Sequence, residues 1–195
     1  TFNYYGADHT WRKLKINLVG PHQVDNASLM LAACEALARK KKVDITEDHV
    51  RKGLNSINWP GRLEIVGQSP RILLDGAHNL AAARNLARFL RDSLPKTSIT
   101  LVAGILDDKP YKAMLLPLMK LCKKVIVTRP VIDRALEPDV LYGVAKQVVR
   151  NVRQFPNVEE AVNFAVKTAK RDEVICIAGS LYVVGEAKQA LEKIM

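Results

Sequence analysis

Short apolar runs alternate with longer stretches of helical periodicity from Leu63 to the end of the chain. The runs are bounded by glycine, proline or polar residues, as buried strands are. The predicted strands are 63–66, 72–74, 98–103, 125–128, 152–155 and 174–178. A helical stretch follows each run from the second onward. This alternation predicts an α/β fold with a mostly parallel, Rossmann-like sheet of about five or six strands and helices on both faces.

Several of the predicted helices have clear start signals. Pro110 and Pro138 stand where a first-turn proline is favoured. Asn157 and Glu160 have the spacing of a capping box. The first helix after residue 63 is predicted over about 80–93, and the last begins near Tyr182.

The first part of the chain has a different pattern. Residues 11–18 alternate apolar and polar side chains, which predicts a half-exposed strand. An apolar helical stretch then runs to about Lys40, and a shorter helix is predicted from Thr46, its cap, to near Gly53. Trp59, Pro60 and Gly61 interrupt the pattern, so we place a boundary there, between domains 1–57 and 58–195.

Polar residues gather just after the predicted strands. Because the carboxyl ends of parallel strands meet at one edge of a sheet, these residues are expected to lie along that edge, where α/β proteins bind ligands. They are Asp75 with His78, Gly104 with Asp107, Asp108 and Lys109, Thr128 with Arg129, and Gly179 with Ser180. Ordinary turn and capping chemistry remains the alternative for each of them.

Composition is that of a globular protein. The chain has 195 residues, of which 48% are hydrophobic and 26% charged. It has no apolar run of membrane-spanning length and no signal-peptide pattern, so a cytoplasmic protein that does not bind membranes is expected. The three cysteines, Cys34, Cys122 and Cys176, lie in apolar patterns without metal-type spacing and are expected to be buried thiols.

The net charge of +10 raises the question of nucleic-acid binding. The densest basic run, 39–42, falls at a predicted helix end, where cations complement the helix dipole. No aromatic residues are interleaved with it, so small anionic substrates are favoured over nucleic acid. The sequence contains neither a Gly-x-Gly-x-x-Gly dinucleotide motif nor a Gly-x-x-x-x-Gly-Lys-Ser/Thr phosphate loop.

Two motifs in close succession carry a family resemblance. Pro60-Gly61-Arg62 is followed, after a glutamate-bearing strand, by Asp75-Gly76-Ala77-His78-Asn79. This pair resembles the start of the C-terminal domain of folylpolyglutamate synthase/dihydrofolate synthase, within the Mur ligase family. The run His22-Gln23-x-x-Asn26-Ala27 is similar to the one that opens the last helix of the family's central ATPase domain. One departure is Leu80, where the family usually has proline.

The resemblance implies a ligase that adds L-glutamate to folate or dihydropteroate, using ATP and Mg²⁺ and forming an acyl phosphate. It implies that Arg62 holds ATP phosphate, that Asp75 acts at the ribose end of ATP and in catalysis, and that Asn26 lies on the adenine side. His78, also catalytic, and Ser180 would lie near the incoming glutamate or the reacting phosphate. Residues 1–57 would be the end of the central ATPase domain and 58–195 the C-terminal domain.

The same resemblance implies that the phosphate loop and magnesium ligands belong to a missing N-terminal ATPase region. The first residue is Thr1 rather than methionine. We therefore expect a fragment that is inactive alone. The sequence does not distinguish dihydropteroate from tetrahydrofolate as the substrate, nor does it give the number of glutamates added or the oligomeric state.

Each candidate also has a plain structural interpretation. Arg62 could pair with Glu64 or a neighbouring carboxylate, Asp75 could cap the helix that follows it, and His78 could be a loop histidine. Ser180 could cap the last helix, and Asp25 or Asn26 the first long one. Two other functions stay open: a Mur-type ligase for peptidoglycan precursors, against which the run 59–64 argues, and a non-catalytic Rossmann-like binding module.

Overall fold

The protein is described by a computed structural model that covers residues 1–194. Its contacts divide the chain into two compact units, one of residues 1–60 and one from Gly61 onward. This division falls close to the predicted boundary. The assignment of each part to a domain of a larger enzyme stays a prediction. In the described range, no helix is long and apolar enough to cross a membrane.

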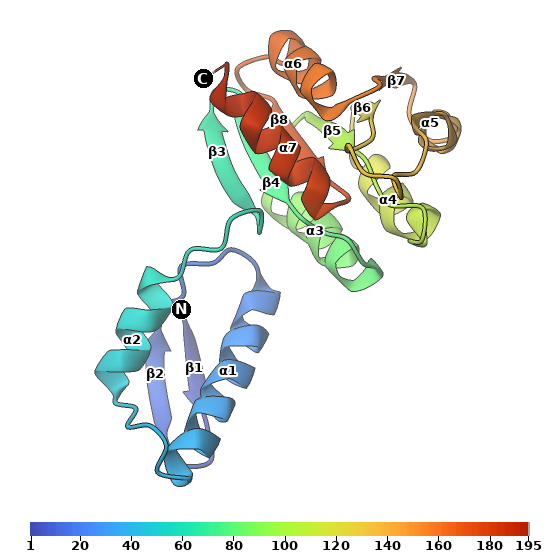
Figure 1. Cartoon of the computed structure of the whole chain (residues 1–195). Helices are drawn as coiled ribbons and strands as arrows, with labels where there is room; N and C mark the ends of the chain where they lie inside the picture. Colours follow the sequence, from blue (N-terminus) through green and yellow to red (C-terminus); the bar gives the residue numbers. More distant parts are fainter. Residues whose placement is uncertain (195) are drawn as a thin grey trace. The chain divides into compact units, whose positions relative to one another are not determined.

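The first unit consists of a hairpin and two helices (Figure 1). Strands β1 (Phe2–Tyr5) and β2 (Thr10–Leu14) pair antiparallel, and are followed by α1 (Pro21–Arg39) and α2 (Glu47–Ser56). The buried side chains that join hairpin and helices are Tyr4, Trp11, Leu14, Ala27, Leu31, Val50 and Leu54. The hairpin buries its apolar face against its own helices, which stabilises an otherwise marginal two-stranded element.

The strand predicted over 11–18 is shorter than expected. Lys13 adopts a left-handed conformation with φ of 53°, and β2 ends at Leu14. The chain then turns to the end of α2, where the Asn17 amide donates to the Leu54 carbonyl at 3.0 Å. The alternating pattern of residues 15–18 therefore belongs to a connecting segment.

The start of α1 differs from the sequence prediction. Gly20, with φ of 108°, precedes Pro21 at the first helical position, and no side chain caps the helix. Proline is favoured there because its fixed φ suits the helix and its missing N–H leaves no donor unpaired. The expectation that Asp25 or Asn26 caps α1 is therefore wrong. Asn26 lies within the helix, exposed, and donates to the Gln23 side chain at 3.1 Å.

The Thr46 cap of α2 is confirmed. The Thr46 hydroxyl accepts from the His49 amide at 3.3 Å, and the His49 ring accepts from the Thr46 amide at 3.4 Å. The helix continues to Ser56, past the predicted end near Gly53. A glycine inside a helix costs only about 1 kcal/mol relative to alanine, so it does not end this one.

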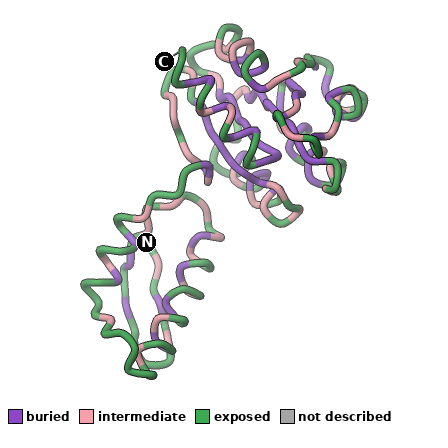
Figure 2. Tube along the Cα trace, viewed as in Figure 1, coloured by how far each residue is buried: buried purple, intermediate pink, exposed green. Residues whose placement is uncertain are grey.

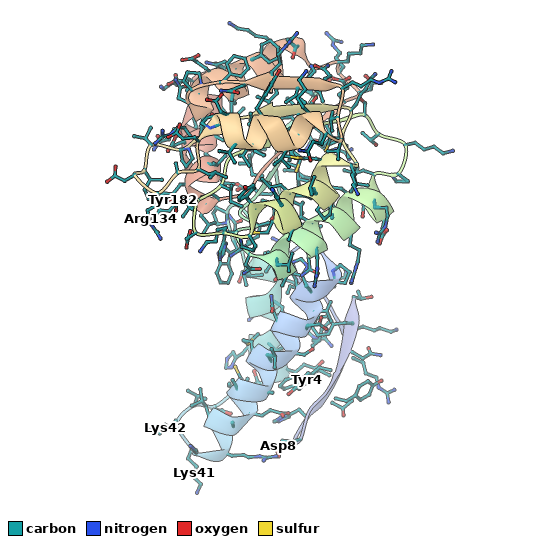
Figure 3. The ribbon with its side chains drawn as sticks, turned by 90° about the vertical axis from the view of Figure 1, so that its right-hand side faces the viewer. Tyr4, Asp8, Lys41, Lys42, Arg134 and Tyr182 are labelled. Carbon is teal, nitrogen blue, oxygen red and sulfur yellow. The ribbon has the colours of Figure 1, made fainter. Side chains whose placement is uncertain are left out.

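A buried carboxylate holds the turn of the hairpin. Glu35 of α1 is 4% exposed. Its oxygens accept from the amides of Ala7 at 3.0 Å, Asp8 at 3.3 Å and His9 at 2.9 Å, and from the Tyr4 hydroxyl at 3.1 Å. In Figure 3, Tyr4 and Asp8 lie on the hairpin beside α1, and Lys41 and Lys42 project from the end of that helix. Burial, followed by the bond to Glu35, raises the pKa of Tyr4 to about 12.

The second unit contains a six-stranded sheet, which confirms the predicted fold class. Its strands are β3 (Glu64–Gln68), β4 (Arg71–Asp75), β5 (Ile99–Ala103), β6 (Lys124–Val127), β7 (Asn151–Gln154) and β8 (Val174–Ala178). Their order in the sheet is β3-β4-β8-β5-β6-β7. Strand β3 is antiparallel to β4, and all other pairs are parallel. The last strand of the sequence thus lies between β4 and β5.

Helices cover both faces of this sheet (Figure 1). They are α3 (Leu80–Ser93), α4 (Tyr111–Met119), α5 (Pro138–Lys146), α6 (Val158–Thr168) and α7 (Leu181–Glu192). The first three pack on one face and the last two on the other, forming separate apolar cores. Figure 2 shows the central strands as nearly continuous buried segments. Strands covered on both faces have continuous apolar sequences, which is why they were recognisable.

The cysteines are free thiols, but only two of the three are buried. Cys122 and Cys176 lie in the second unit's core, where burial raises the pKa of Cys122 to about 12 and that of Cys176 well above its usual range. Cys34, on α1, is partly exposed and lies 3.5 Å from the sulfur of Met30.

Candidate functional site

The two family-like motifs meet at the carboxyl end of β4. The Gly76 amide donates to the Gly61 carbonyl at 2.7 Å, and the Leu63 amide donates to Asp75 Oδ2 at 3.0 Å. Because β3 runs antiparallel to β4, the loop before β3 lies beside the loop after β4. We call residues 61–63 the arginine loop and 76–79 the histidine loop. The sheet therefore brings Arg62 and His78 to the same edge.

Asp75 connects the two loops. It is 7% exposed. Besides the Leu63 amide, its carboxylate accepts from the Ala77 amide at 3.0 Å. The bond to Leu63 supports a left-handed backbone, φ of 48°, that costs a residue other than glycine about 1–3 kcal/mol. Asp75 is thus part of the framework of the site, and its role toward ATP stays a prediction.

Asn79, and not Asp75, caps α3. Its Oδ1 accepts from the Ala82 amide at 2.9 Å. Leu80 is the first residue of the helix, the position at which proline is favoured. The departure from the family pattern at Leu80 therefore leaves the helix start intact.

Replacing Asn79 with alanine should lower the free energy of unfolding of the second unit by about 1 kcal/mol, because a helix amide loses its acceptor. Chemical denaturation followed by circular dichroism would measure this change. Asn85→Ala, inside the same helix, is the matched control and should have a smaller effect, since alanine is the better helix former. Equal losses in both variants would contradict the capping role.

His78 has a defined tautomer. Its Nδ1 lies 2.8 Å from the Gly76 carbonyl oxygen. A carbonyl only accepts hydrogen bonds, so Nδ1 carries the proton and donates. In the neutral ring, Nε2 is then the nitrogen left with a lone pair for a ligand. The histidine loop fixes this ring through its own backbone.

Arg62 does not pair with Glu64. Glu64 Oε1 lies 2.8 Å from Lys188 Nζ, and Oε2 accepts from the Gly61 amide at 2.6 Å. Within residues 1–194, the partly exposed Arg62 side chain makes no hydrogen bond or ion pair. The plain structural interpretation of this arginine is therefore wrong. Its guanidinium remains available for an anionic ligand.

The ends of β8 and β5 approach each other closely beside these loops. Gly179 has φ of 111°, and a Cβ on it would lie well within 3.0 Å of the Gly104 carbonyl oxygen. Ser180 follows, 3% exposed, and its hydroxyl accepts from the Tyr182 amide at 3.2 Å. Ser180 therefore caps α7. Contact of this hydroxyl with glutamate stays a prediction.

Asp107, Asp108, Lys109 and Arg129 all have partners within the protein, whereas the buried Thr128 hydroxyl has none in the described residues. The Asp107 amide donates to the Arg134 carbonyl at 2.9 Å, and Asp108 pairs with Lys109 at 2.7 Å. The hydrogen bond from Lys109 is the main cause that lowers the pKa of Asp108. Arg129 pairs with Glu137. These contacts are ordinary loop chemistry, so the structure adds no ligand role for this group.

Two further features bear on ligand binding. Asn26 belongs to the first unit, whereas Arg62, Asp75, His78 and Ser180 belong to the second. The role of Asn26 on the adenine side therefore stays a prediction. No group of three or more His, Cys, Asp or Glu side chains in residues 1–194 is arranged to hold a metal ion. The sequence offered Glu64 as a partner of Arg62 and gave no signal for Lys188, because no local pattern links residues 124 positions apart.

Comparison with known proteins gives a family match. The model of "Mur ligase, glutamate ligase domain" matches residues 61–181. A dihydrofolate synthase/folylpolyglutamate synthase of Bacillus subtilis is 28% identical over 191 residues, covering 98% of this chain and 44% of that protein. The match to the family model includes both loops at the end of β4.

Solved structures agree with the sequence matches. Escherichia coli FolC in complex with DHPP and ADP is similar with a TM-score of 0.83 and 28% identity, over 96% of this chain and 43% of that one. A bifunctional folylpolyglutamate synthase/dihydrofolate synthase from Yersinia pestis, complexed with AMPPNP and Mn ion, has a TM-score of 0.78 and 25% identity, over 95% and 42%. This chain spans less than half the length of each of these proteins. It belongs to the Mur ligase family, and the relatives that it matches along nearly its whole length are folylpolyglutamate and dihydrofolate synthases.

Proposed function

We propose that this chain is the C-terminal part of an ATP-dependent ligase that joins L-glutamate to folate or dihydropteroate. The similarity to a dihydrofolate synthase/folylpolyglutamate synthase over 98% of the chain supports the reaction class. The complexes of two similar proteins with ADP or AMPPNP support the nucleotide. The structural observation that carries the proposal is the hydrogen-bonded pair of loops. At one sheet edge they present an oriented histidine and an arginine that has no hydrogen-bond or ion-pair partner among the described residues.

The proposed reaction has two steps. The substrate carboxylate attacks the terminal phosphate of ATP, giving an acyl phosphate and ADP. The glutamate amine then attacks the acyl carbon, forms the amide and releases phosphate. Much of the protein's work is to neutralise and orient phosphate charge, for which a guanidinium is suited. Arg62 has this role in the proposal.

The other candidate residues have roles consistent with their hydrogen bonds. His78 presents Nε2 to the incoming glutamate or the reacting phosphate. The Ser180 hydroxyl accepts from Tyr182 and retains its own proton for donation to glutamate. Asp75 sets both loops and, in the proposal, contacts the ribose end of ATP. Asn26 is assigned to the adenine side.

The magnesium ion of the proposed reaction has no ligand assigned in this chain. The donor side chains of residues 1–194 do not form a metal-binding group. One similar protein is complexed with AMPPNP and Mn ion, which supports a divalent metal for the family. We assign the magnesium ligands and the phosphate loop to an ATPase region outside this chain, and we expect the chain alone to be inactive.

ATP binding tests the role of Arg62. Titration calorimetry of ATP into this chain should show weak binding that Arg62→Ala lowers about 10- to 100-fold, the effect of losing charge-assisted hydrogen bonds. Arg88→Ala is the matched control, because Arg88 is exposed on α3 and is not part of either loop. It removes the same charge, so equal losses in both variants would show only a general electrostatic effect.

Unchanged binding in Arg62→Ala would contradict the assignment of phosphate to this residue. A turnover assay with ATP, L-glutamate and a folate tests the expectation of inactivity, and product formed by this chain alone would contradict it. Exchanging the matching segment of the Bacillus subtilis relative for this chain would test the substrate class, with a peptidoglycan precursor as the competing substrate.

A further inference from the structure

One face of α7 supports both loops of the candidate site. A Cβ on Gly76 would collide with the Leu181 side chain, and a Cβ on Gly61 would lie 3.0 Å from Cγ1 of Val184. Lys188, one turn further along, pairs with Glu64 at 2.8 Å. Residues three and four positions apart lie on the same face of a helix. The family match ends at residue 181, so most of this face lies beyond it.

A chain of polar contacts leads from Lys188 to the arginine loop. Lys188 Nζ pairs with Oε1 of Glu64, and Oε2 of the same carboxylate accepts from the Gly61 amide at 2.6 Å. The Gly61 carbonyl in turn accepts from the Gly76 amide. Hydrogen bonds to an ionised carboxylate are stronger than those between neutral groups. Lys188 therefore orients the carboxylate that fixes the residue before Arg62.

The position of Arg62 depends on this backbone. Its side chain makes no contact of its own with a polar partner in the part of the chain that the structure describes. The residues on either side have φ values of 71° at Gly61 and 48° at Leu63. A left-handed conformation at Leu63 persists only where surrounding contacts hold it. Loss of the Gly61 contact would let the loop relax and move the arginine.

We propose that Lys188 is a positioning residue for Arg62, acting through Glu64 and the Gly61 amide. The proposal rests on the proposed function in one respect, that Arg62 binds ATP phosphate. It adds the last helix to the parts of the protein that determine nucleotide affinity. The relevant variant is Lys188→Met, which keeps the apolar stem and removes the charge.

The first measurement needs no ligand. In a ¹⁵N-labelled sample of the full chain, Lys188→Met should shift the Gly61 amide and Arg62 side-chain Nε–H resonances and speed Gly61 amide exchange about tenfold. Lys188→Arg restores a cation and should return both signals toward their original values. Lys193→Met is the matched control, because Lys193 directly follows the last residue of α7 and pairs with Glu159, away from the loop. Unchanged Gly61 and Arg62 signals in Lys188→Met would overturn the proposal.

The second measurement is ATP affinity in the same variants. Lys188→Met should weaken ATP binding several-fold, Lys188→Arg should recover it, and Lys193→Met should have the smaller effect expected of one distant surface charge. Adding Lys188→Met to Arg62→Ala should not lower ATP affinity further, because Lys188 affects binding only through Arg62. One result would overturn the positioning role: Lys188→Met changes the Gly61 and Arg62 signals but leaves ATP affinity unchanged, while Arg62→Ala lowers that affinity. If Arg62→Ala itself keeps full affinity, the phosphate role proposed for Arg62 fails, and the ligand-free signals alone decide whether Lys188 positions Arg62.

Discussion

Gly179→Ala should be the most destabilising of the single substitutions considered in the second unit. The added Cβ would meet the Gly104 carbonyl oxygen, a backbone atom that cannot rotate away. The φ of 111° is also strained for any residue with a Cβ. The two effects together should lower the free energy of unfolding by about 3 kcal/mol or more. Hydrogen exchange of the β5 and β8 amides would locate this loss at the centre of the sheet.

Gly185→Ala provides the matched control. Gly185 lies within α7, and apart from its chain neighbours and the adjacent backbone of that helix, no heavy atom of the described residues lies within 4 Å of the position where its Cβ would be. Alanine at an unobstructed helical position should stabilise the unit by about 0.5–1 kcal/mol. The two alanine variants are therefore expected to shift stability in opposite directions. Equal stability of Gly179→Ala and the unmodified protein would contradict the close approach of β5 and β8.

Glu35→Ala should have the largest effect in the first unit. It removes the acceptor of three hairpin amides and of the Tyr4 hydroxyl. The Tyr4 hydroxyl is buried, and a buried donor without a partner costs about 1–3 kcal/mol, whereas the exposed residues Ala7, Asp8 and His9 can donate to water instead, so the loss should fall within that range. Trp11, buried in this unit, and Trp59 are the only tryptophans of the sequence, so tryptophan fluorescence follows the unfolding of residues 1–60.

The same carboxylate gives the first unit a dependence on acid. Burial by itself would raise the pKa of Glu35, but the hydrogen bonds from Ala7, Tyr4, His9 and Asp8 together lower the pKa below its usual value. A carboxyl group whose pKa is lower in the folded state stabilises that state at pH values above its unfolded pKa. This stabilisation is lost as the pH falls through the folded pKa.

Fluorescence-detected unfolding between pH 7 and pH 3 would measure this dependence. The free energy of unfolding of the first unit should depend less on pH in Glu35→Ala, because that variant lacks the carboxylate. Asp25→Asn removes an exposed carboxylate from the same helix and should leave the dependence nearly unchanged. A pH dependence that persists in full in Glu35→Ala would assign the acid sensitivity to other groups.

Much of the second unit's fold can be predicted from the sequence. Most of the strands are short apolar runs, although β7 has a single buried residue, and all six lie close to their predicted positions. Several helix starts followed local rules: Pro138 is the first residue of α5, and Asn157 accepts from the Glu160 amide at 2.9 Å. Pro110, expected in a first turn, instead precedes α4. Such signals involve residues a few positions apart. They succeed because local preference and tertiary packing agree.

The errors arose where distant or unusual backbone contacts decide the structure. The positive φ at Lys13 ended β2 early, and Gly20 with Pro21 began α1 before the polar residues expected to cap it. In the candidate site, the sequence indicated Arg62 and His78 but not the partner of Glu64. That partner, Lys188, is brought near only by the complete sheet and its last helix.

The position of β8 affects when the second unit can form during synthesis. This strand lies between β4 and β5, so one edge of each of these two strands stays unpaired until residues 174–178 have been made. Synthesis proceeds from the N-terminus, so β3 and β4 can form a hairpin, and β5, β6 and β7 a separate three-stranded sheet, before β8 exists. Until then the facing edges of β4 and β5 have no strand to pair with. Unpaired strand edges invite pairing with other chains. Nascent chains that stop before residue 174 would therefore be candidates for chaperone binding or degradation, however well their individual helices form.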